Sequence, residues 1–346
     1  MQRVTDTNKR ISRRDVAKAA GVSLTTVTHA LSETPGTRVN QDTRRLVKRI
    51  ATELGYRPSF VGKALSVGKT YTVGLLLPKF GSLRYGFYQD ICMGLSEAMK
   101  FDDYNMLLLF REEDFSYMKV IDQGKVDAFI IIQSDFDTSH IDRVVSSGIP
   151  TVVINKWVDT EKFSNLACVC SDNKKFVKDF LDDFQSMRCK NVLAIHDYLG
   201  SDTNSWMYRF FNEELEKRAA SGLTGASIIP AKENRKQQFL NLLRSGQRWD
   251  GIFIDCSSDG SILIDAASEC GIDAGKDFTL ISTSTEAYSF TLQRREYRFY
   301  SQQGQLMGRD AWKLLSFLMY GDIQNKTIFV PYEKCSVNKQ KRKDQL

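Results

Sequence analysis

The sequence predicts a small all-α head followed by a larger α/β body whose parallel sheets form two lobes. Three observations support this fold class. Short helical segments separated by a glycine turn occupy the first part of the chain, and the excess positive charge is confined to the same part. From Tyr71 onward, short apolar runs alternate with helical segments. A chain of 346 residues is long enough for a small head and a large core.

The positive charge of the chain lies in the predicted head. Residues 1–69 hold 14 Lys and Arg residues against 5 Asp and Glu residues, whereas the rest of the chain holds 34 against 37. Such an asymmetry favours a polyanion as the partner of the head. A solvated basic surface is the alternative, but the same segment also carries a DNA-binding pattern.

The first two predicted helices make a helix-turn-helix unit. Ser12 can cap the first helix, and Asp15 favours its positive end. Gly21 breaks that helix and permits a tight turn, and Ser23 caps the next one. The small apolar residues expected to face inward are Val16, Ala17, Ala20, Val27, Ala30 and Leu31.

The outer face of the second helix is expected to read DNA. Short polar side chains near a helix N-terminus reach base edges, and a leucine meets a thymine methyl group. The predicted base-reading residues are Leu24, Thr25, Thr28 and His29. A solvent-exposed helix histidine is the alternative for His29. The predicted phosphate contacts, which position the head without reading sequence, are Ser12, Ser23 and Thr26.

A third helix and a short fourth helix complete the predicted head. The third follows Asn40 and ends at Gly55, with a buried stripe of Leu46, Val47, Ile50 and Leu54 and an outer face of Arg44, Arg45, Lys48 and Arg49. Pro58 is suited to the first turn of a helix over residues 59–65. Two turns are too short to be stable alone in water, so we expect this helix to form only when bound.

Two motifs in residues 10–78 resemble the LacI family of bacterial transcription regulators. They read Asp15-Val16-Ala17-x-x-Ala20-Gly21-Val22-Ser23-x-x-Thr26-Val27-x-x-x-Leu31 and Val39-x-x-x-Thr43-Arg44-x-x-Val47…Leu54-Gly55-Tyr56-x-Pro58. The resemblance implies that the hinge helix enters the minor groove and that Leu65 wedges between base pairs and kinks the DNA. Its predicted contacts are Ser59, Val61, Gly62 and Leu65. Gly62 stands where the family usually has alanine, which weakens the hinge helix by about 1 kcal/mol.

The body reads as a doubly covered α/β structure. Continuous apolar runs predict buried parallel strands at 72–77, 106–110, 128–132, 151–154, 167–170, 192–195, 251–254 and 278–281, with helices such as 88–100 and 206–218 between them. One sheet rarely holds so long a chain, so two lobes are expected. The resemblance, carried here by Pro78, Gly148-Ile149-Pro150, Asp172-Asn173 and Gly308 among others, implies the type I periplasmic-binding-protein fold.

These observations predict three parts of the chain. Residues 10–57 form the helix-turn-helix domain, 58–69 the hinge helix and linker, and 70–340 the effector-binding and dimerisation domain. Within the last, lobe 1 is expected at about 70–170 and 298–324, and lobe 2 at about 171–297 and 325–340.

The interlobe cleft is the predicted effector site, because ligands of open α/β folds bind beyond the carboxyl ends of the strands. Aromatic faces beside polar groups are typical of sugar sites, although ordinary packing is an equal alternative for each aromatic residue alone. The candidate residues are Phe80, Tyr85, Phe87, Asn155, Trp157, His196, Asp197 and Trp206.

Two charged effector anchors that the resemblance implies are missing. Met207 stands at the position of the usual arginine, and Ser284, in the run Ser282-Thr283-Ser284-Thr285, at that of the usual aspartate. Either the effector is unusual or the effector response has been altered.

Enzymatic, metal-binding and disulfide functions find no support in the sequence. His196-Asp197 lacks a second histidine nearby, and no Gly-x-Ser-x-Gly or His-Glu-x-x-His motif occurs. The seven cysteines include no Cys-x-x-Cys pair, so buried thiols are expected, with no metal and no cofactor.

The sequence therefore predicts a DNA-binding transcription regulator, most simply a repressor of a carbohydrate-type metabolic operon. Its expected partners are a palindromic operator in double-stranded DNA, a small effector such as a sugar or sugar derivative, and a second copy of the chain. A homodimer is expected because the tail 338–346 carries no leucine heptad. We expect a cytoplasmic, nucleoid-associated protein without a membrane partner. An effector-independent architectural regulator and a solute-binding protein are the alternatives.

Overall fold

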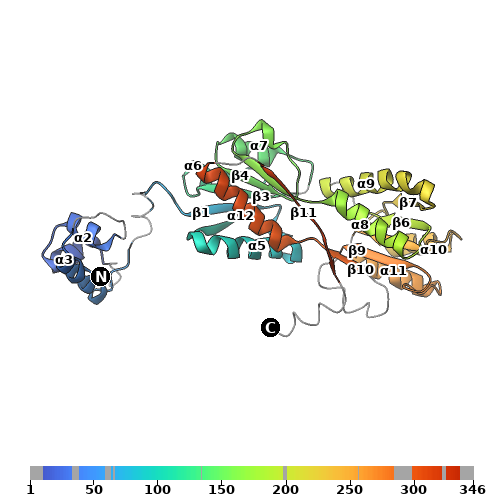
Figure 1. The fold of residues 1–346 in the computed structure, drawn as a ribbon, viewed down its shortest axis with the longest axis horizontal. Coiled ribbons are helices and arrows are strands. Elements are labelled where there is room, and N and C mark those ends of the chain that lie inside the picture. The colour runs from blue at the N-terminus through green and yellow to red at the C-terminus, as the bar shows by residue number, and fades with distance from the viewer. Residues whose placement is uncertain are drawn as a thin grey trace, which may run out of the picture. The chain divides into compact units, whose positions relative to one another are not determined.

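The structure is a computed structural model that describes residues 11–32, 39–58, 64, 67–133, 135–197, 201–255, 257–283, 298–321 and 325–335. The chain divides into two compact units, a head within Met1–Thr70 and a body within Tyr71–Leu346. Figure 1 shows the head as a group of helices and the body as two sheets flanked by helices.

Within the described residues, the head has the helices α1 (Arg13–Ala20), α2 (Leu24–Leu31) and α3 (Gln41–Glu53). Ser12 and Asp15 form a capping box at the start of α1, and Gly21 ends this helix with a left-handed φ of 66°. Val16, Val27 and Val47, one from each helix, are completely buried at the centre of a small apolar core. The predicted helix-turn-helix unit is confirmed.

Two predictions for α3 are wrong. Ala51 is buried in place of Leu54, which is 37% exposed because it follows the last helical residue. Arg44, predicted on the outer face, is partly buried, and its guanidinium donates to the carbonyl oxygens of Ala30 and Ser32 at 3.4 and 3.1 Å. Arg44 thus closes the C-terminal end of α2 instead of projecting toward a ligand.

Lobe 1 of the body is built on a parallel sheet of order β11-β5-β4-β3-β1-β2. Its strands are β1 (Thr72–Leu77), β2 (Asn105–Phe110), β3 (Ala128–Ile132), β4 (Thr151–Ile154), β5 (Leu166–Ser171) and β11 (Thr327–Val330). Its α-helices are α5 (Gly86–Met99), α6 (Met118–Asp122), α7 (Ser139–Ser146) and α12 (Gly304–Tyr320), with short 3-10 turns at Phe80–Arg84, Lys100–Asp102 and Thr160–Lys162.

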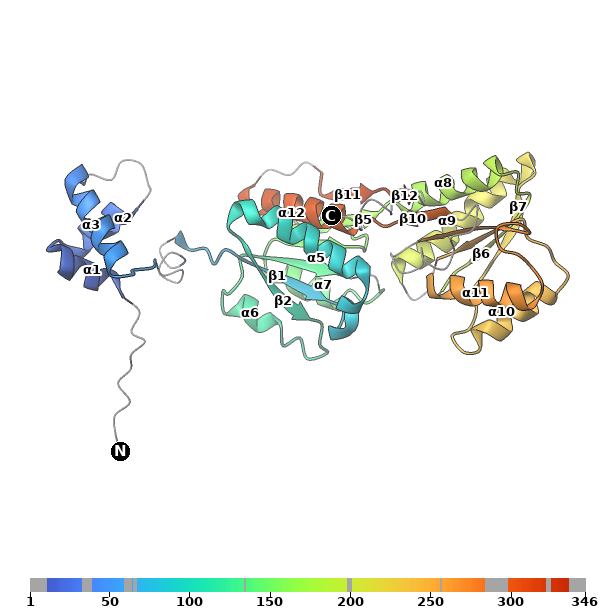
Figure 2. The same ribbon diagram turned by 90° about the horizontal axis from the view of Figure 1, so that it is seen from below.

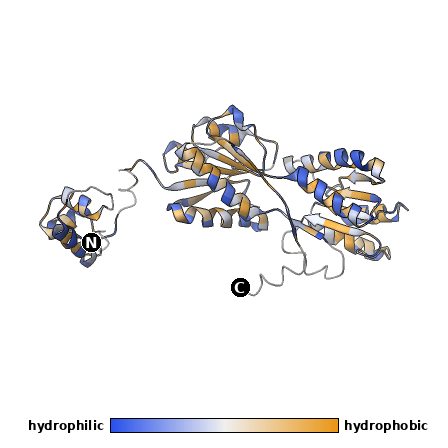
Figure 3. Ribbon diagram, in the orientation of Figure 1, coloured by the Kyte–Doolittle hydropathy of each residue, from blue (hydrophilic) through white to orange (hydrophobic). Residues whose placement is uncertain are grey.

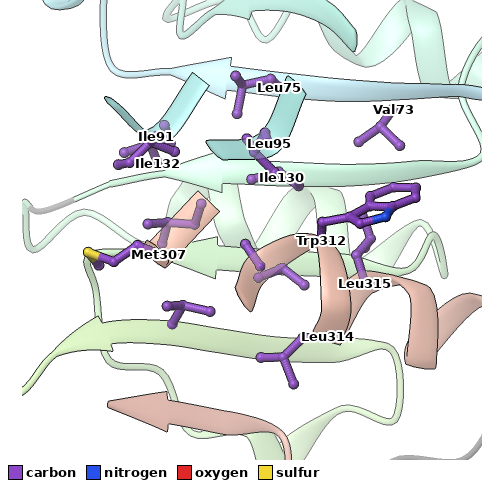
Figure 4. Close-up of a cluster of buried hydrophobic side chains, with 14 of the residues drawn as sticks. Val73, Leu75, Ile91, Leu95, Ile130, Ile132, Met307, Trp312, Leu314 and Leu315 are labelled. Carbon is purple, nitrogen blue, oxygen red and sulfur yellow. The ribbon is translucent and has the colours of Figure 1, made fainter. Parts of the chain in front are cut away.

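The helices α5 and α12 run side by side on one face of this sheet, although they are far apart in sequence (Figures 1 and 2). Figure 4 shows their inward side chains packed against β1 and β3, with Ile91, Leu95, Met307, Trp312 and Leu315 among those that it labels. The opposite face packs against α6 and α7 through a second apolar cluster.

Two glycines permit the close contact of α5 with α12. A Cβ atom on Gly94 would lie 2.0 Å from the carbonyl oxygen of Gln305, and one on Gly308 would lie 2.4 Å from that of Ile91. Both partners are backbone atoms, which cannot move aside as a flexible side chain could. The two helices therefore require glycine at these positions.

Lobe 2 repeats the arrangement with a second sheet of order β12-β10-β9-β8-β6-β7. Its strands are β6 (Asn191–Ile195), β7 (Thr224–Ile228), β8 (Gly251–Ile254), β9 (Thr279–Thr283), β10 (Arg298–Ser301) and β12 (Glu333–Cys335). Its helices are α8 (Asn173–Ser186), α9 (Asp202–Arg218), α10 (Arg235–Arg244) and α11 (Ser257–Glu269), followed in α9 by a short turn at Ala219–Ser221. Helices α8 and α9 cover one face and α10 and α11 the other.

The chain crosses between the lobes three times; the first crossing lies where it was predicted, and the second and third lie later in the chain than predicted. Strand β10, expected in lobe 1, pairs with β9 in lobe 2, whereas β11, expected in lobe 2, pairs with β5 in lobe 1. The crossings follow Ser171, Ser301 and Val330. Sequence order alone does not show which open sheet edge an isolated strand will join, because the decision depends on long-range pairing.

All eight predicted strands are confirmed, and the strands that were missed lie at the edges of the sheets or next to them. These are β7, β10, β11 and β12, which are short or alternate between polar and apolar residues. Figure 3 shows the central strands as hydrophobic and the outer surfaces of the helices as largely hydrophilic. None of the helices in the described residues is long and apolar enough to span a membrane.

Candidate DNA-binding face and ligand cleft

Helix α2 presents exposed side chains on the side opposite its buried face. Ser23 caps the helix by accepting a hydrogen bond from the amide of Thr26 at 3.0 Å. Among the predicted base-reading residues, Leu24, Thr25 and His29 are exposed, and Leu24 is 43% exposed although it is large and apolar. An apolar side chain held in water at the start of a capped helix is suited to contact with a base.

Thr28, the fourth predicted base-reading residue, is partly buried, and its hydroxyl donates to the carbonyl oxygen of Leu24 at 3.0 Å. This bond occupies its one proton, so Thr28 offers DNA a methyl group and an acceptor oxygen. Its hydroxyl would have to rotate before it could donate to a base.

The predicted phosphate-binding residues stand at the starts of α1 and α2. The Ser12 hydroxyl donates to Asp15 at 2.6 Å, and the hydroxyls of Ser23 and Thr26 are 2.8 Å apart. Each hydroxyl is thus held by its own helix cap. The partial positive charge of the helix N-terminus favours a phosphate at the same place.

The predicted hinge contacts Ser59, Val61, Gly62 and Leu65 lie outside the described residues. Among the described neighbours, the carbonyl oxygen of Ala64 accepts hydrogen bonds from the amides of Gly68 and Lys69 at 2.8 and 3.2 Å.

In the body, a cavity of about 270 Å³ lies between residues of the two lobes. Lobe 1 lines it where β4, β5 and β11 end, and lobe 2 lines it from the first turn of α8 and the N-terminal half of α9. The lining residues are Asn155, Trp157, Cys170, Ser171, Asp172, Asn173, Lys174, Thr203, Trp206, Phe210 and Phe329. Its position beyond the carboxyl ends of parallel strands is where the fold places ligands.

Asn155 is the polar residue of the cavity wall whose conformation is most unusual. It follows β4 directly with a φ of 66°, a left-handed conformation that asparagine tolerates better than most residues. Its side-chain oxygen is buried and has no hydrogen-bond partner in the protein. A buried acceptor without a partner is costly, so this oxygen is suited to a donor on a ligand.

Two tryptophans supply aromatic surface from opposite lobes. Trp157 follows β4 and is 49% exposed, and Trp206 lies in the first turns of α9. The guanidinium of Arg209 lies 4.2 Å from the Trp206 ring centroid, which fixes the indole by a cation–π contact. Large flat apolar faces beside an amide match the composition of carbohydrate and other planar-ligand sites.

Of the eight predicted effector residues, Asn155, Trp157 and Trp206 line the cavity, and the other five do not. Phe87 packs against the lobe 1 core, and Tyr85 is 60% exposed beside Tyr88. Phe80 is 79% exposed, with its ring against Phe110. These three side chains follow β1, whereas the cavity lies at the other side of the sheet, beyond β4, β5 and β11.

His196 and Asp197 belong to a network within lobe 2. His196 is 1% exposed, and its Nδ1 lies 3.1 Å from Oδ2 of Asp255, a residue that sequence reasoning missed. Arg235, at the start of α10, forms ion pairs with Asp197 and Asp259. The signal for Asp255 was its position directly after a predicted strand. The ion pairs of Arg235 with Asp197 and Asp259 depend on where α10 and α11 lie, which the sequence does not show.

Met207, predicted to stand at the position of an effector anchor, does not line the cavity. Met207 is 3% exposed and packs in the core of lobe 2, while Trp206 and Phe210 of the same helix line the cavity. A methionine at this position therefore does not by itself leave the cavity without a cation. Lys174, at the first turn of α8, supplies one at the cavity rim. Ser284 lies outside the described residues.

The head and the first part of the body each match a family model. Residues 14–59 match the bacterial regulatory proteins of the lacI family, and residues 70–183 match the periplasmic binding proteins and sugar binding domain of the LacI family. The HTH-type transcriptional regulator RegA of Clostridium saccharobutylicum is 27% identical over 78% of this chain and 80% of its own length. The probable HTH-type transcriptional repressor ExuR of Bacillus subtilis (strain 168) is 29% identical over 54% of this chain and 55% of its own.

A crystal structure of the lac repressor dimer bound to operator and an anti-inducer has the same fold. Its TM-score is 0.75 at 15% sequence identity, covering 95% of this chain and 98% of that one. A helix-turn-helix head followed by a two-lobed α/β body is the architecture of a DNA-binding transcription regulator. The chain belongs to the LacI family of bacterial regulatory proteins.

Proposed function

We propose that the protein is a sequence-specific transcriptional repressor whose operator affinity is controlled by a small neutral effector held in the cavity between the lobes. The observation that carries the proposal is that one chain holds both an exposed helix face and a cavity lined by polar and aromatic residues. Helix α2 exposes Leu24, Thr25 and His29 to a partner, and the body encloses a cavity with an unpartnered acceptor, Asn155.

On DNA, two heads of a homodimer would bind the half-sites of a palindromic operator. Leu24, Thr25, Thr28 and His29 would contact bases in the major groove, and Ser12, Ser23 and Thr26 would hold phosphates. The hinge residues Ser59, Val61, Gly62 and Leu65 would contact the minor groove, with Leu65 as the wedge. Such a protein would act in the cytoplasm, on the DNA of the nucleoid.

In the body, the indole faces of Trp157 and Trp206 would stack on the effector, and Asn155 would accept a hydrogen bond from one of its hydroxyl groups. This combination favours a sugar or sugar derivative. An effector that binds the closed lobes better than the open lobes shifts their equilibrium, and its affinity is then coupled reciprocally to that of the operator.

Selection of bound sequences from random DNA tests the head. Replacing His29 with Ala should relax the preference at one base position in each half-site by about 1–3 kcal/mol. Arg45→Ala is the matched control, because this side chain is 78% exposed on α3 and would touch only phosphate. It should weaken binding to all sequences alike. Equal loss on operator and random DNA for His29→Ala would overturn base reading by this residue.

Asn155→Gly tests the effector site without straining the backbone, since glycine adopts the same positive φ. Effector binding should weaken by about tenfold, the loss expected for one hydrogen bond. Asn234→Gly is the matched control, because Asn234 also has a positive φ, 55°, and lies away from the cavity. The ligand is first identified by calorimetric titration of the full chain with sugars, nucleobases and cell extract. If nothing binds and nothing shifts operator affinity, an effector-independent regulator replaces the proposal.

A further inference from the structure

Two cysteines lie side by side on β5, beneath the cavity. Cys168 and Cys170 are two residues apart on one strand, so both thiols face the same side of the sheet, toward α7. Cys168 is completely buried, and Cys170 is 6% exposed. Cys170 lines the proposed effector cavity, but neither thiol has a role in the effector contacts described above.

The two thiols are coupled by a hydrogen bond. The Cys170 thiol donates to the sulfur of Cys168, and this bond, with help from the Thr327 hydroxyl 3.5 Å away, lowers the pKa of Cys168 to about 7 despite its burial. Burial raises the pKa of the Cys92 and Cys189 thiols instead. The Cys168–Cys170 pair therefore loses a proton more readily than the Cys92 or Cys189 thiol.

The cavity gives solutes access to one member of the pair. Cys170 contributes to the cavity wall, and Cys168 does not. The same wall carries four aromatic rings, those of Trp157, Trp206, Phe210 and Phe329, together with polar residues. Aromatic walls favour planar, conjugated and uncharged molecules, and a thiolate at such a wall is a nucleophile.

We propose that Cys170 is a covalent modification site that captures small planar α,β-unsaturated carbonyl compounds from the cleft, with Cys168 as the positioning residue that takes up its proton. The Cys170 proton passes to the Cys168 thiolate. The Cys170 sulfur then forms a bond to the β-carbon of the ligand, and the π electrons of the C=C bond move to give an enolate. The enolate takes a proton at its α-carbon from Cys168, which returns to the thiolate. No electrons are gained or lost, and the product is a thioether.

N-Ethylmaleimide is a suitable probe because it is a planar unsaturated carbonyl compound. The full chain is labelled between pH 5 and 9, and the rate at each cysteine is read from peptide masses. Cys170 should label at least tenfold faster than Cys92 and Cys189 at pH 7, because its proton can pass to Cys168, whose pKa is lowered. Labelling of Cys170 no faster than that of Cys92 would overturn the proposal. The measurement needs no DNA, so its outcome is independent of the proposed repressor function.

Cys168→Ser tests the positioning role. Serine keeps the size of the side chain but cannot act as a thiolate, so the midpoint of Cys170 labelling should rise toward the ordinary cysteine pKa, and the rate at pH 7 should fall roughly tenfold. Cys92→Ser is the matched control and should leave the Cys170 profile unchanged. Labelling of the unfolded chain in denaturant should abolish the difference in both proteins. An unchanged midpoint in folded Cys168→Ser would show that Cys168 has no such role.

Discussion

The two lobes of the body have similar six-stranded sheets but are stabilised by different side chains. The sheets differ at one edge, where β11 pairs parallel to β5 in lobe 1 and β12 pairs antiparallel to β10 in lobe 2. Lobe 1 packs aliphatic side chains between α5 and α12, whose backbones touch at Gly94 and Gly308. Lobe 2 has an aromatic core, in which Phe180 stacks on Phe253 at 4.3 Å, and it holds charged groups inside. The two lobes thus have nearly the same strand order but different side chains in their cores.

The charged groups of lobe 2 tie its crossing strands to a helix. Asp183 of α8, 8% exposed, accepts from Lys334 of β12 at 2.5 Å, from Tyr300 of β10 at 2.7 Å and from Arg298 of β10 at 2.8 Å. Strands β10 and β12 lead into and out of the crossings between the lobes. Asp183 thus holds the lobe 2 ends of two crossing segments through charged hydrogen bonds. In lobe 1, by contrast, the close contact is between the backbones of α5 and α12.

The largest effect is expected from Gly94→Ala in lobe 1. The added Cβ atom would overlap the backbone of Gln305, so α5 and α12 must separate, and stability should fall by about 3 kcal/mol or more. Denaturant unfolding followed by circular dichroism measures the loss. Gly81→Ala is the control, because a Cβ atom there meets no neighbour within 4 Å and the glycine has no positive φ. Equal stability of the two variants would remove close helix packing as the basis of lobe 1.

Asp183→Asn should have the largest effect in lobe 2, about 3 kcal/mol, since Arg298 and Lys334 would keep their charges without a carboxylate. Asp179→Asn removes only a partly exposed i,i+4 pair with Lys175 and should change stability by less than about 1 kcal/mol. Thermal unfolding of both variants against the parent measures the difference. A loss as small as that of the control would mean that the crossings do not depend on Asp183.

The Asp183 carboxylate should also make the stability of the protein sensitive to acid. Burial acts to raise the pKa of Asp183, but the hydrogen bonds from Lys334, Tyr300 and Arg298 outweigh it and leave this pKa below its usual value. The folded state then binds fewer protons than the unfolded state. The stabilisation is complete above about pH 4 and is lost as pH falls further. In Asp183→Asn, the stability curve should be flatter below pH 4 than in the parent.

The smallest effect concerns the buried histidine of lobe 1. The Tyr117 hydroxyl lies 2.7 Å from Nδ1 of His140, so Tyr117→Phe should reduce stability by about 1 kcal/mol. Tyr320→Phe is the control, because that hydroxyl is in an exposed residue, 3.4 Å from the hydroxyl of Tyr104. Burial lowers the pKa of His140, and Arg111 lowers it further. Parent stability should therefore fall as pH drops below about 6.5. Stability independent of pH between 7 and 5.5 in the parent would contradict this account.

Features of the head were predictable because their causes are local in sequence. The capping box joins Ser12 to Asp15, and Gly21 sits where the chain needs a left-handed residue. Periodicity likewise gave the buried faces of α1 and α2. Arg44 was misplaced because its partners, the carbonyl oxygens of Ala30 and Ser32, belong to another helix. The sequence alone does not show whether a basic side chain will bind DNA or will donate hydrogen bonds to the carbonyl oxygens at the end of a neighbouring helix.

In the cleft, the carboxyl ends of strands indicated the right edge of the sheets but not the residues that meet there. Asn155 and Trp157 follow β4 and line the cavity, yet Phe80 and Tyr85, which follow β1 in the same way, do not. Trp206 and Met207 are adjacent on one helix, and only the docking of α9 decides that the first faces the cavity and the second the core.

The sequence by itself determined the helix-turn-helix head, the alternation of strands and helices, and the separation of charge between head and body. These depend on residues a few positions apart, through caps, periodicity and composition. The tertiary structure alone decided which strand joins which sheet, which aromatic rings enclose the cavity, and that Asp183, Arg298 and Lys334 meet. Each of those facts needs segments far apart in the chain to come together. Their pairing is set by the competition of many weak contacts, which no local pattern records.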